Sequence, residues 1–180
     1  MKIKEICFVS LFAALTSLGA LYSIPLPFSP VPITLQSLVT LLAGLLLGSR
    51  LGMLSQVVYV ALGAAGLPIF SKGQAGIGVL LGPSGGYLLG FIAAAYLVGK
   101  LTEGREDCSL GRLVLVFLVA TVIIYILGLG RLMMVTGLPF SQALMAGVIY
   151  FIPGDILKIT FSSLVGWRVY RVLVTAKLKV

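Results

Sequence analysis

The sequence contains no histidine and only two cysteines. These two residue types supply most protein ligands of zinc and of the softer transition metals, so a transition-metal site is not expected. The sequence also contains no Gly-Lys-Ser or Gly-Lys-Thr triplet, which excludes a Walker A phosphate-binding loop. The sequence therefore predicts a protein that holds neither a metal nor a nucleotide, and no other cofactor is indicated.

Charged residues are scarce as well. They make up 10% of the chain, whereas hydrophobic residues make up 59%. A soluble domain carries about a quarter charged residues, so this chain cannot cover a soluble surface and is predicted to be an integral membrane protein. Its polar stretches reach roughly a dozen residues, well short of the ~50 residues of a small soluble domain. Residues 1–180 are therefore expected to form a single membrane domain.

The net charge of +8 could indicate a nucleic-acid partner. The lysines and arginines, however, flank apolar runs, as residues that set membrane topology do. We therefore expect the lipid bilayer, and no nucleic acid, as the surroundings of this chain.

Acidic residues are nearly absent from the apolar body of the chain, where Asp155 stands alone. Without a second carboxylate nearby, acid–base chemistry by a carboxylate pair is not supported. Because histidine is missing too, an intramembrane enzyme is not favoured, and we expect a protein that catalyses no reaction.

The apolar runs predict an all-α, polytopic membrane protein with six transmembrane helices. The first five cover about residues 4–22, 35–48, 52–66, 85–101 and 113–134, and the sixth ends near Arg171. A straight span needs about 20 residues, so the second and third are short and are expected to extend into the flanking apolar loops.

The basic residues predict the orientation. With the N-terminus inside, ten of them are cytoplasmic, two lie on or near the outer side and Lys158 lies within the membrane. The cytoplasmic ones are Lys2, Lys4, Arg50, Lys100, Arg105, Arg112, Arg168, Arg171, Lys177 and Lys179. This asymmetry predicts a multi-pass protein of the cell membrane with both termini in the cytoplasm. The two cysteines, Cys7 and Cys108, fall on the cytoplasmic side and are expected to be free thiols.

Prolines and glycines mark the outer side. All eight prolines fall in or near the outer half, namely Pro25, Pro27, Pro30, Pro32, Pro68, Pro83, Pro139 and Pro153. None falls in the two predicted inner connections, residues 48–52 and 103–112. Because proline interrupts regular helix, the outer loops are predicted to be irregular. Such apolar loops can cover a ligand pocket, or they can be ordinary connections between helices.

The last apolar run, from Ser141 to Arg171, is longer than one span requires. We expect Ser141 to cap a short helix that ends near Ile152, followed by a break and a final span from Pro153. Asp155 would then lie in the first helical turn, where the helix dipole favours a negative side chain.

Asp155 and Lys158 are three residues apart and therefore share one face of that helix. Each charge in an apolar span costs roughly 2.5–3.5 kcal/mol on insertion scales, so such residues are usually functional. The pair can present an acceptor and a donor to a polar ligand group, or it can be a structural pair that neutralises itself.

Four further residues are candidate ligand contacts. Gln74, Ser84 and Tyr87 belong to a glycine-rich stretch that can form a ligand wall lined by backbone, or simply a turn before a closely packed helix. Gln36 begins the second segment and can bond either a loop or a ligand.

Arg131 ends an apolar run and can either reach the outer interface or face an anionic ligand group.

Small residues on the first segment, including Ala13, Ala14 and Ser17, follow the small-xxx-small spacing that allows helices in lipid to approach closely. This face can serve an internal contact or the docking of another membrane subunit.

Five motifs in series resemble the BioY family, the biotin-binding S components of energy-coupling factor (ECF) transporters. They are VPITLQ at 31–36, LAGLLLG at 42–48, GAAGLPIF at 63–70, LGPSGGYL at 81–88 and PGDILK at 153–158. The motifs occur in matching order over nearly the whole chain, so the resemblance is specific.

The resemblance implies biotin uptake by six helices with a biotin pocket near the outer side. It also implies a transmembrane coupling protein and two ATPase subunits as partners, with Ala13, Ala14 and Ser17 as the docking face. The family's Gly-Asp-x-x-Lys motif, which contacts the polar head of biotin, corresponds to Asp155 and Lys158. Ser84 stands where the family usually has threonine, and Arg131 where an aromatic residue is frequent, so Arg131 is left out of the ligand set.

Two alternatives remain open at this point. An S component for a different vitamin would share the glycine-rich loop and the apolar helices. A structural membrane subunit without a transport role would share the helices but would bind no ligand.

Overall fold

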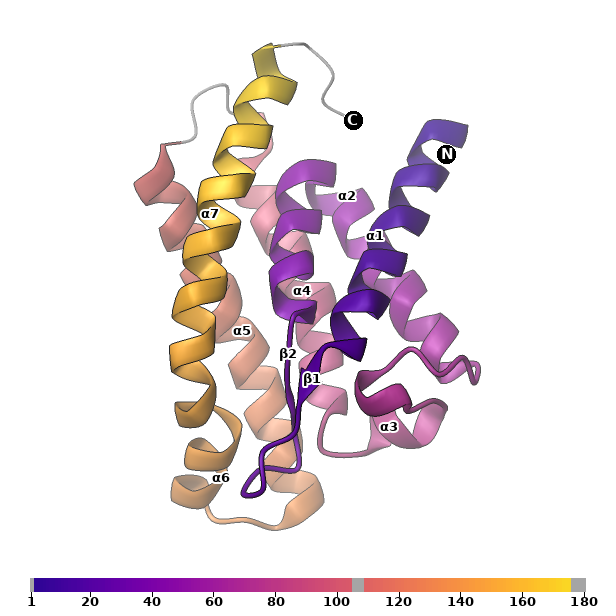
Figure 1. The fold of residues 1–180 in the computed structure, drawn as a ribbon, viewed down its shortest axis with the longest axis vertical. Helices are drawn as coiled ribbons and strands as arrows, with labels where there is room; N and C mark the ends of the chain where they lie inside the picture. Colours follow the sequence, from indigo (N-terminus) through magenta and orange to yellow (C-terminus); the bar gives the residue numbers. More distant parts are fainter. Residues whose placement is uncertain (1, 105–108, 176–180) are drawn as a thin grey trace.

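The computed structural model describes residues 2–104 and 109–175 and is predominantly helical (Figure 1). Its long helices are α1 (Ile3–Leu21), α2 (Gln36–Ala64), α4 (Gly85–Thr102), α5 (Leu110–Thr136) and α7 (Ile152–Thr175). The short elements are β1 (Ser23–Ile24), β2 (Ile33–Thr34), η1 (Ser71–Gly73), α3 (Ile77–Leu81), α6 (Phe140–Gly147) and η2 (Ile149–Phe151). The all-α prediction is therefore confirmed.

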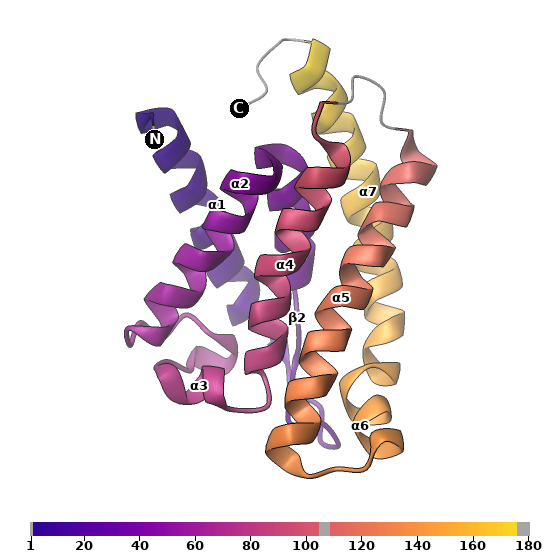
Figure 2. The ribbon, with the colours of Figure 1, turned by 180° about the vertical axis from the view of Figure 1, so that it is seen from behind.

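The helix α2 contains two of the predicted spans. Gly48 has non-helical backbone angles, with φ at 82° and ψ at −179°, and it breaks α2 into two arms. The second arm runs back beside the first, as both views show (Figures 1 and 2). Five helical stretches are long and apolar enough to cross a membrane, and α2 is one of them. Counting its two arms separately gives the six predicted segments, with the predicted tight turn between them.

Small residues let the helices approach one another closely. The α4 helix lies between α2 and α5 and packs against both. A Cβ added to Gly52 would come within 2.9 Å of the Ala43 carbonyl oxygen, and one added to Gly99 would overlap the backbone of Ser49. In lipid, where burial of apolar surface does not drive helices together, close contact of this kind is a main source of attraction.

The elements separate into two ends of the bundle (Figure 1). The N-terminus, the Gly48 turn and the last turn of α7 lie at one end, which we call the charged end. The β1–β2 hairpin, α3 and α6 lie at the other, which we call the loop end. The predicted separation of basic connections from proline-rich loops is thus present in the fold.

Hydrogen bonds fasten the charged end. The Glu103 carboxylate accepts from the Ser49 backbone amide at 2.5 Å and from its hydroxyl at 2.8 Å, which joins α4 to the turn of α2. The Tyr170 hydroxyl donates to the Thr102 carbonyl oxygen at 2.7 Å and joins α7 to α4. Cys7 is an exposed free thiol, as expected, and Cys108 lies outside the described residues.

A break before the last span is present, but it lies at Val148, with φ at −135° and ψ at −61°, so the expected end of the short helix near Ile152 is wrong. The α6 helix ends at Gly147, η2 follows, and α7 begins at Ile152, so Pro153 lies in its first turn. The expected cap at Ser141 is wrong, because Pro139 caps α6 and the helix begins at Phe140. The fixed φ of proline and its missing amide suit a position just outside a helix, which explains the earlier start.

We predict that Gly48→Ala will destabilise the fold. The φ of Gly48 is open essentially only to glycine, and a Cβ there would come within 2.7 Å of the Glu103 carboxylate. A strain of about 1–3 kcal/mol should lower the melting temperature in detergent by roughly 2–12 °C. Gly130→Ala is the matched control, because a Cβ there meets open space within a helix. Equal melting temperatures for the two variants would contradict this account of the turn.

Candidate ligand-binding site

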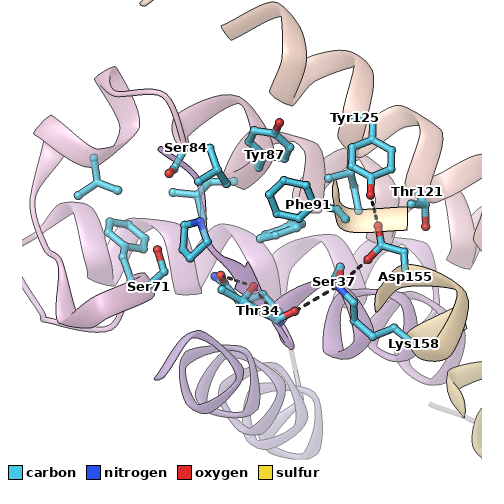
Figure 3. A pocket seen from close by; sticks show the side chains of 18 residues that line it. Thr34, Ser37, Ser71, Ser84, Tyr87, Phe91, Thr121, Tyr125, Asp155 and Lys158 are labelled. Carbon is cyan, nitrogen blue, oxygen red and sulfur yellow. Dashed lines mark hydrogen bonds and ion pairs between the residues drawn. The ribbon is translucent and has the colours of Figure 1, made fainter. Parts of the chain in front are cut away.

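A cavity lies at the loop end and is lined by residues of α2, α4, α5, η2 and α7 and of the segments 31–34, 70–71 and 79–84 (Figure 3). It leaves about 60 Å³ for the centres of water molecules, several times the ~10–15 Å³ that one water needs. Much of its wall is apolar, and this part includes Val31, Phe70, Val79, Phe91, Ile124 and Phe151. A mostly apolar pocket with a few fixed polar groups is typical of a small-molecule site.

Asp155 and Lys158 supply the charges of this cavity. The Lys158 ammonium lies 2.5 Å from Asp155 Oδ1, and the two side chains are 11% and 13% exposed, respectively. The i to i+3 spacing in the first turns of α7 creates this contact, as the sequence predicts. An ion pair that is so little exposed offsets part of the cost of removing each charge from water.

The Lys158 ammonium is fully used by the protein. Besides Asp155, it donates to the Thr34 carbonyl oxygen at 3.2 Å and to the Ser37 hydroxyl at 3.0 Å. An ammonium has three hydrogens, so each has a protein acceptor. Lys158 therefore links α7 to β2 and to the first turn of α2 (Figure 3).

The Asp155 carboxylate keeps acceptor capacity. Its Oδ2 accepts from the Tyr125 hydroxyl of α5, while Oδ1 is paired with Lys158. A carboxylate offers about four lone-pair sites, so two protein partners leave room for a ligand donor. Of the charged pair, Asp155 is thus the member that can bond a ligand without giving up a protein contact.

Gln36 lines the same cavity and is only 4% exposed. Its amide donates to the Tyr59 hydroxyl at 2.5 Å, and its side-chain oxygen accepts from the Thr34 hydroxyl at 2.9 Å. The Tyr59 hydroxyl in turn donates to the Ile69 carbonyl oxygen at 3.3 Å. Gln36 therefore has a structural role at the start of α2 and keeps one amide hydrogen for a ligand.

Ser84 and Tyr87 also line the cavity, but in different ways. Ser84 precedes α4 and makes no side-chain cap bond, so its hydroxyl is not used by the helix. The Tyr87 hydroxyl donates to the Gly147 carbonyl oxygen at 2.8 Å and ties α4 to the end of α6. Tyr87 therefore contributes its ring to the wall, and its hydroxyl points away from the cavity (Figure 3).

Gln74 does not join this group. It is exposed and lines a neighbouring surface hollow, whose wall also includes Val79 and Ser84. The structure thus brings together Asp155, Lys158, Gln36, Ser84 and the ring of Tyr87.

The small residues of α1 divide between two faces. Ala13 is 3% exposed and packs in the core, whereas Ala14 is exposed. The Ser17 side chain is half-buried and its hydroxyl donates to the Ala13 carbonyl oxygen at 2.9 Å. Of the predicted docking residues, only Ala14 and Ser17 therefore reach the face of α1 that points away from the bundle.

Three residues of the site, Tyr125, Thr34 and Ser37, were not predicted from the sequence. Tyr125 lies thirty residues before Asp155 in the chain, and the folded bundle alone brings the two together. A polar signal was present, because Thr121 and Tyr125 lie one turn apart within residues 113–130, which are otherwise apolar, and both line the cavity. Thr34 uses its backbone carbonyl oxygen toward Lys158, and no side-chain pattern reveals such a contact.

Arg131 lies outside the cavity. Its guanidinium donates to the carbonyl oxygen of Leu81, the last residue of α3. This hydrogen bond therefore links α5 to the end of α3.

Comparison with known proteins gives consistent results. The model of the BioY family matches residues 1–175. The "Probable biotin transporter BioY" of Pyrococcus horikoshii is 40% identical over 168 residues, covering 93% of this chain and 97% of the relative. The "Biotin transporter BioY" of Rhizobium etli is 37% identical over 174 residues, covering 92% of each. A crystal structure of the S-component for biotin from an ECF-type ABC transporter superposes with a TM-score of 0.85 at 28% identity, over 93% of this chain and 90% of that one.

We predict a strong energetic coupling between Asp155 and Lys158. Lys158→Met leaves a nearly buried carboxylate unpaired and should destabilise the protein by about 3 kcal/mol. Asp155→Leu together with Lys158→Met should recover much of that loss, because no unpaired charge remains. Thermal unfolding of both single variants and the double variant in detergent measures the coupling. Additive losses would show that the two side chains act independently.

Proposed function

Since this chain belongs to the BioY family, we propose that it is the S component that captures biotin for uptake across the cell membrane. It is a membrane transport protein and not an enzyme, and biotin is its transported ligand rather than a cofactor. The observation that carries the proposal is the Asp155–Lys158 pair, set in a mostly apolar cavity at the loop end.

The chemistry of biotin fits this cavity. Its ureido group has two N–H donors and one carbonyl acceptor. Asp155 has unused lone pairs for an N–H donor, and charge-assisted bonds of this kind are roughly twice as strong as neutral ones. The apolar remainder of biotin suits a wall that includes Phe70, Phe91 and Phe151.

We assign different roles to the two charged residues. Asp155 accepts from the ureido group, while Lys158 holds the carboxylate and fastens α7 to α2 through Thr34 and Ser37. Lys158 can donate to the ureido carbonyl only by exchanging one of these protein acceptors. Gln36 and Ser84 are the remaining proposed polar contacts in the cavity. Gln74 would contact only a ligand that extends from the cavity into the neighbouring hollow.

The proposal extends to topology and partners. We place the loop end outside and both termini in the cytoplasm, with residues 1–180 as one membrane domain. The proposed partners are a transmembrane coupling protein and two ATPase subunits, which supply the energy that this chain cannot obtain itself. The Ala14 and Ser17 face of α1 is the proposed docking surface, because it presents small side chains outward.

Titration of the purified chain with biotin tests the proposed function. The chain should bind biotin, and an equal concentration of another vitamin should not displace it. Asp155→Asn should weaken binding by about ten-fold or more, because the ureido donors lose a charged acceptor. Lys158→Ala should weaken binding further, since it leaves the carboxylate unpaired and detaches α7 from α2. Calorimetry in detergent measures all three affinities.

Lys100→Ala is the matched control, because Lys100 is exposed and lies in the last turn of α4 at the charged end. It should bind biotin as the parent does. Unchanged affinity in both pocket variants would contradict the assignment of this cavity. Displacement by another vitamin would favour an S component of different specificity, and absence of any binding would favour a structural subunit.

The docking proposal is tested with Ala14→Trp. A bulky side chain should block the close approach of the coupling protein and abolish co-purification of the complex, while biotin affinity stays unchanged. Ala61→Trp is the control, because Ala61 is an exposed alanine of the second arm of α2. Loss of the complex in both variants, or in neither, would contradict a docking role for this face.

A further inference from the structure

The segment that closes one side of the cavity is weakly held. The α3 helix contains five residues and none of them is buried. The residue before it, Gly76, is the N-cap and has a φ of 90°, and the Gly76 amide donates to the Gly63 carbonyl oxygen at 2.8 Å. Figure 2 shows α3 at the lower end of the bundle, beside the start of α4. A surface element with so little burial is expected to open more readily than the helices around it.

The cavity depends on this segment nonetheless. Val79 of α3 and Ser84, which follows it, both line the wall. Leu81 lies between these two residues and is the last residue of α3. Any displacement of the Leu81 backbone therefore moves two parts of the cavity wall.

Arg131 holds that backbone. Its guanidinium donates to the Leu81 carbonyl oxygen, one of the acceptors that the end of a helix leaves without an intrahelical partner. A cation at a helix C-terminus is also favoured by the local backbone dipoles. The hydrogen bond thus joins the loose segment to α5, a 27-residue helix.

Close packing of α4 against α5 allows Arg131 to reach this carbonyl. A Cβ added to Gly86 would lie 2.5 Å from the Arg131 Cβ and would overlap the Leu127 backbone. Glycine at position 86 therefore lets α5 approach α4 closely enough for the arginine side chain to reach Leu81. The buried Nε of Arg131 has no hydrogen-bond partner within the described residues, so the Leu81 bond is made at some cost.

We propose that Arg131 is a positioning residue that keeps α3 closed over the cavity and thereby slows the release of bound ligand. This inference rests on the proposed function for the identity of the ligand, biotin. Arg131 does not touch the cavity, and its effect is transmitted through Leu81 to Val79 and Ser84. The proposal predicts an effect on dissociation rather than on association.

The first test compares biotin kinetics. Arg131→Met keeps the apolar stem on Gly86 but removes the donors, and it should raise the dissociation rate about ten-fold. Arg131→Lys should lie within about three-fold of the parent, since an ammonium can still donate to a carbonyl. Arg131→Gln should be intermediate. Lys72→Met, which removes an exposed cation from the same loop end, should dissociate as the parent does.

The second test needs no ligand. Hydrogen exchange of the Gly82 amide, which donates to the Gly78 carbonyl oxygen at 2.9 Å, reports the opening of α3. Arg131→Met should speed this exchange about ten-fold, while the amides of α1 keep the parent's rates and show that the fold is intact.

The outcomes separate the two proposals. If the parent fails to bind biotin but Gly82 exchange rises in Arg131→Met, the proposed function is refuted and the hold on α3 stands. Unchanged Gly82 exchange refutes the role of Arg131 whatever the binding result. A slower association with unchanged dissociation also refutes it, because that pattern is typical of attraction of an anionic ligand. If Arg131→Met does not fold, equal dissociation rates for the glutamine, lysine and parent proteins refute it.

Discussion

The Asp155 carboxylate is the point at which three parts of the bundle meet. It binds the ammonium of Lys158 and the hydroxyl of Tyr125, so it joins α7 to α5. Lys158 extends the same network to Thr34 and Ser37 at the start of α2. A charge within an apolar span is costly, and this network is what makes it tolerable. The loop end therefore closes around a polar centre, whereas toward the charged end the helices are held by close packing of small residues.

The two ends of the molecule are built in contrasting ways. At the charged end, Glu103 and Tyr170 bond backbone groups of neighbouring helices. At the loop end, short elements with few buried side chains surround a cavity. A binding site needs a wall that can open, and such walls come from the less stable parts of a fold. This contrast matches a protein that takes up its ligand at one end and keeps the other end fixed.

Much of the fold could be predicted from the sequence. Apolar runs and basic flanks gave the six segments, and Gly48 with Gly52 marked the turn between the two shortest. Pro153 correctly marked the start of the last span. The predicted N-cap of α6, Ser141, lies two residues after the observed one, Pro139. Both serine and proline are common at helix starts, so residue preference alone does not decide between the two positions. The site was only partly predictable.

Asp155 and Lys158 stood out because charge in an apolar run is rare. The partners of Lys158 and of Asp155 did not stand out, because a backbone carbonyl and a distant tyrosine join the site through tertiary contact alone.

A structure of the chain with biotin bound tests the central claim most directly. The account predicts a ureido N–H within hydrogen-bond distance of an Asp155 carboxylate oxygen, with Lys158 still on that carboxylate. A ureido ring at the opposite wall beside Phe70 and Ser71, or outside the cavity, would contradict it.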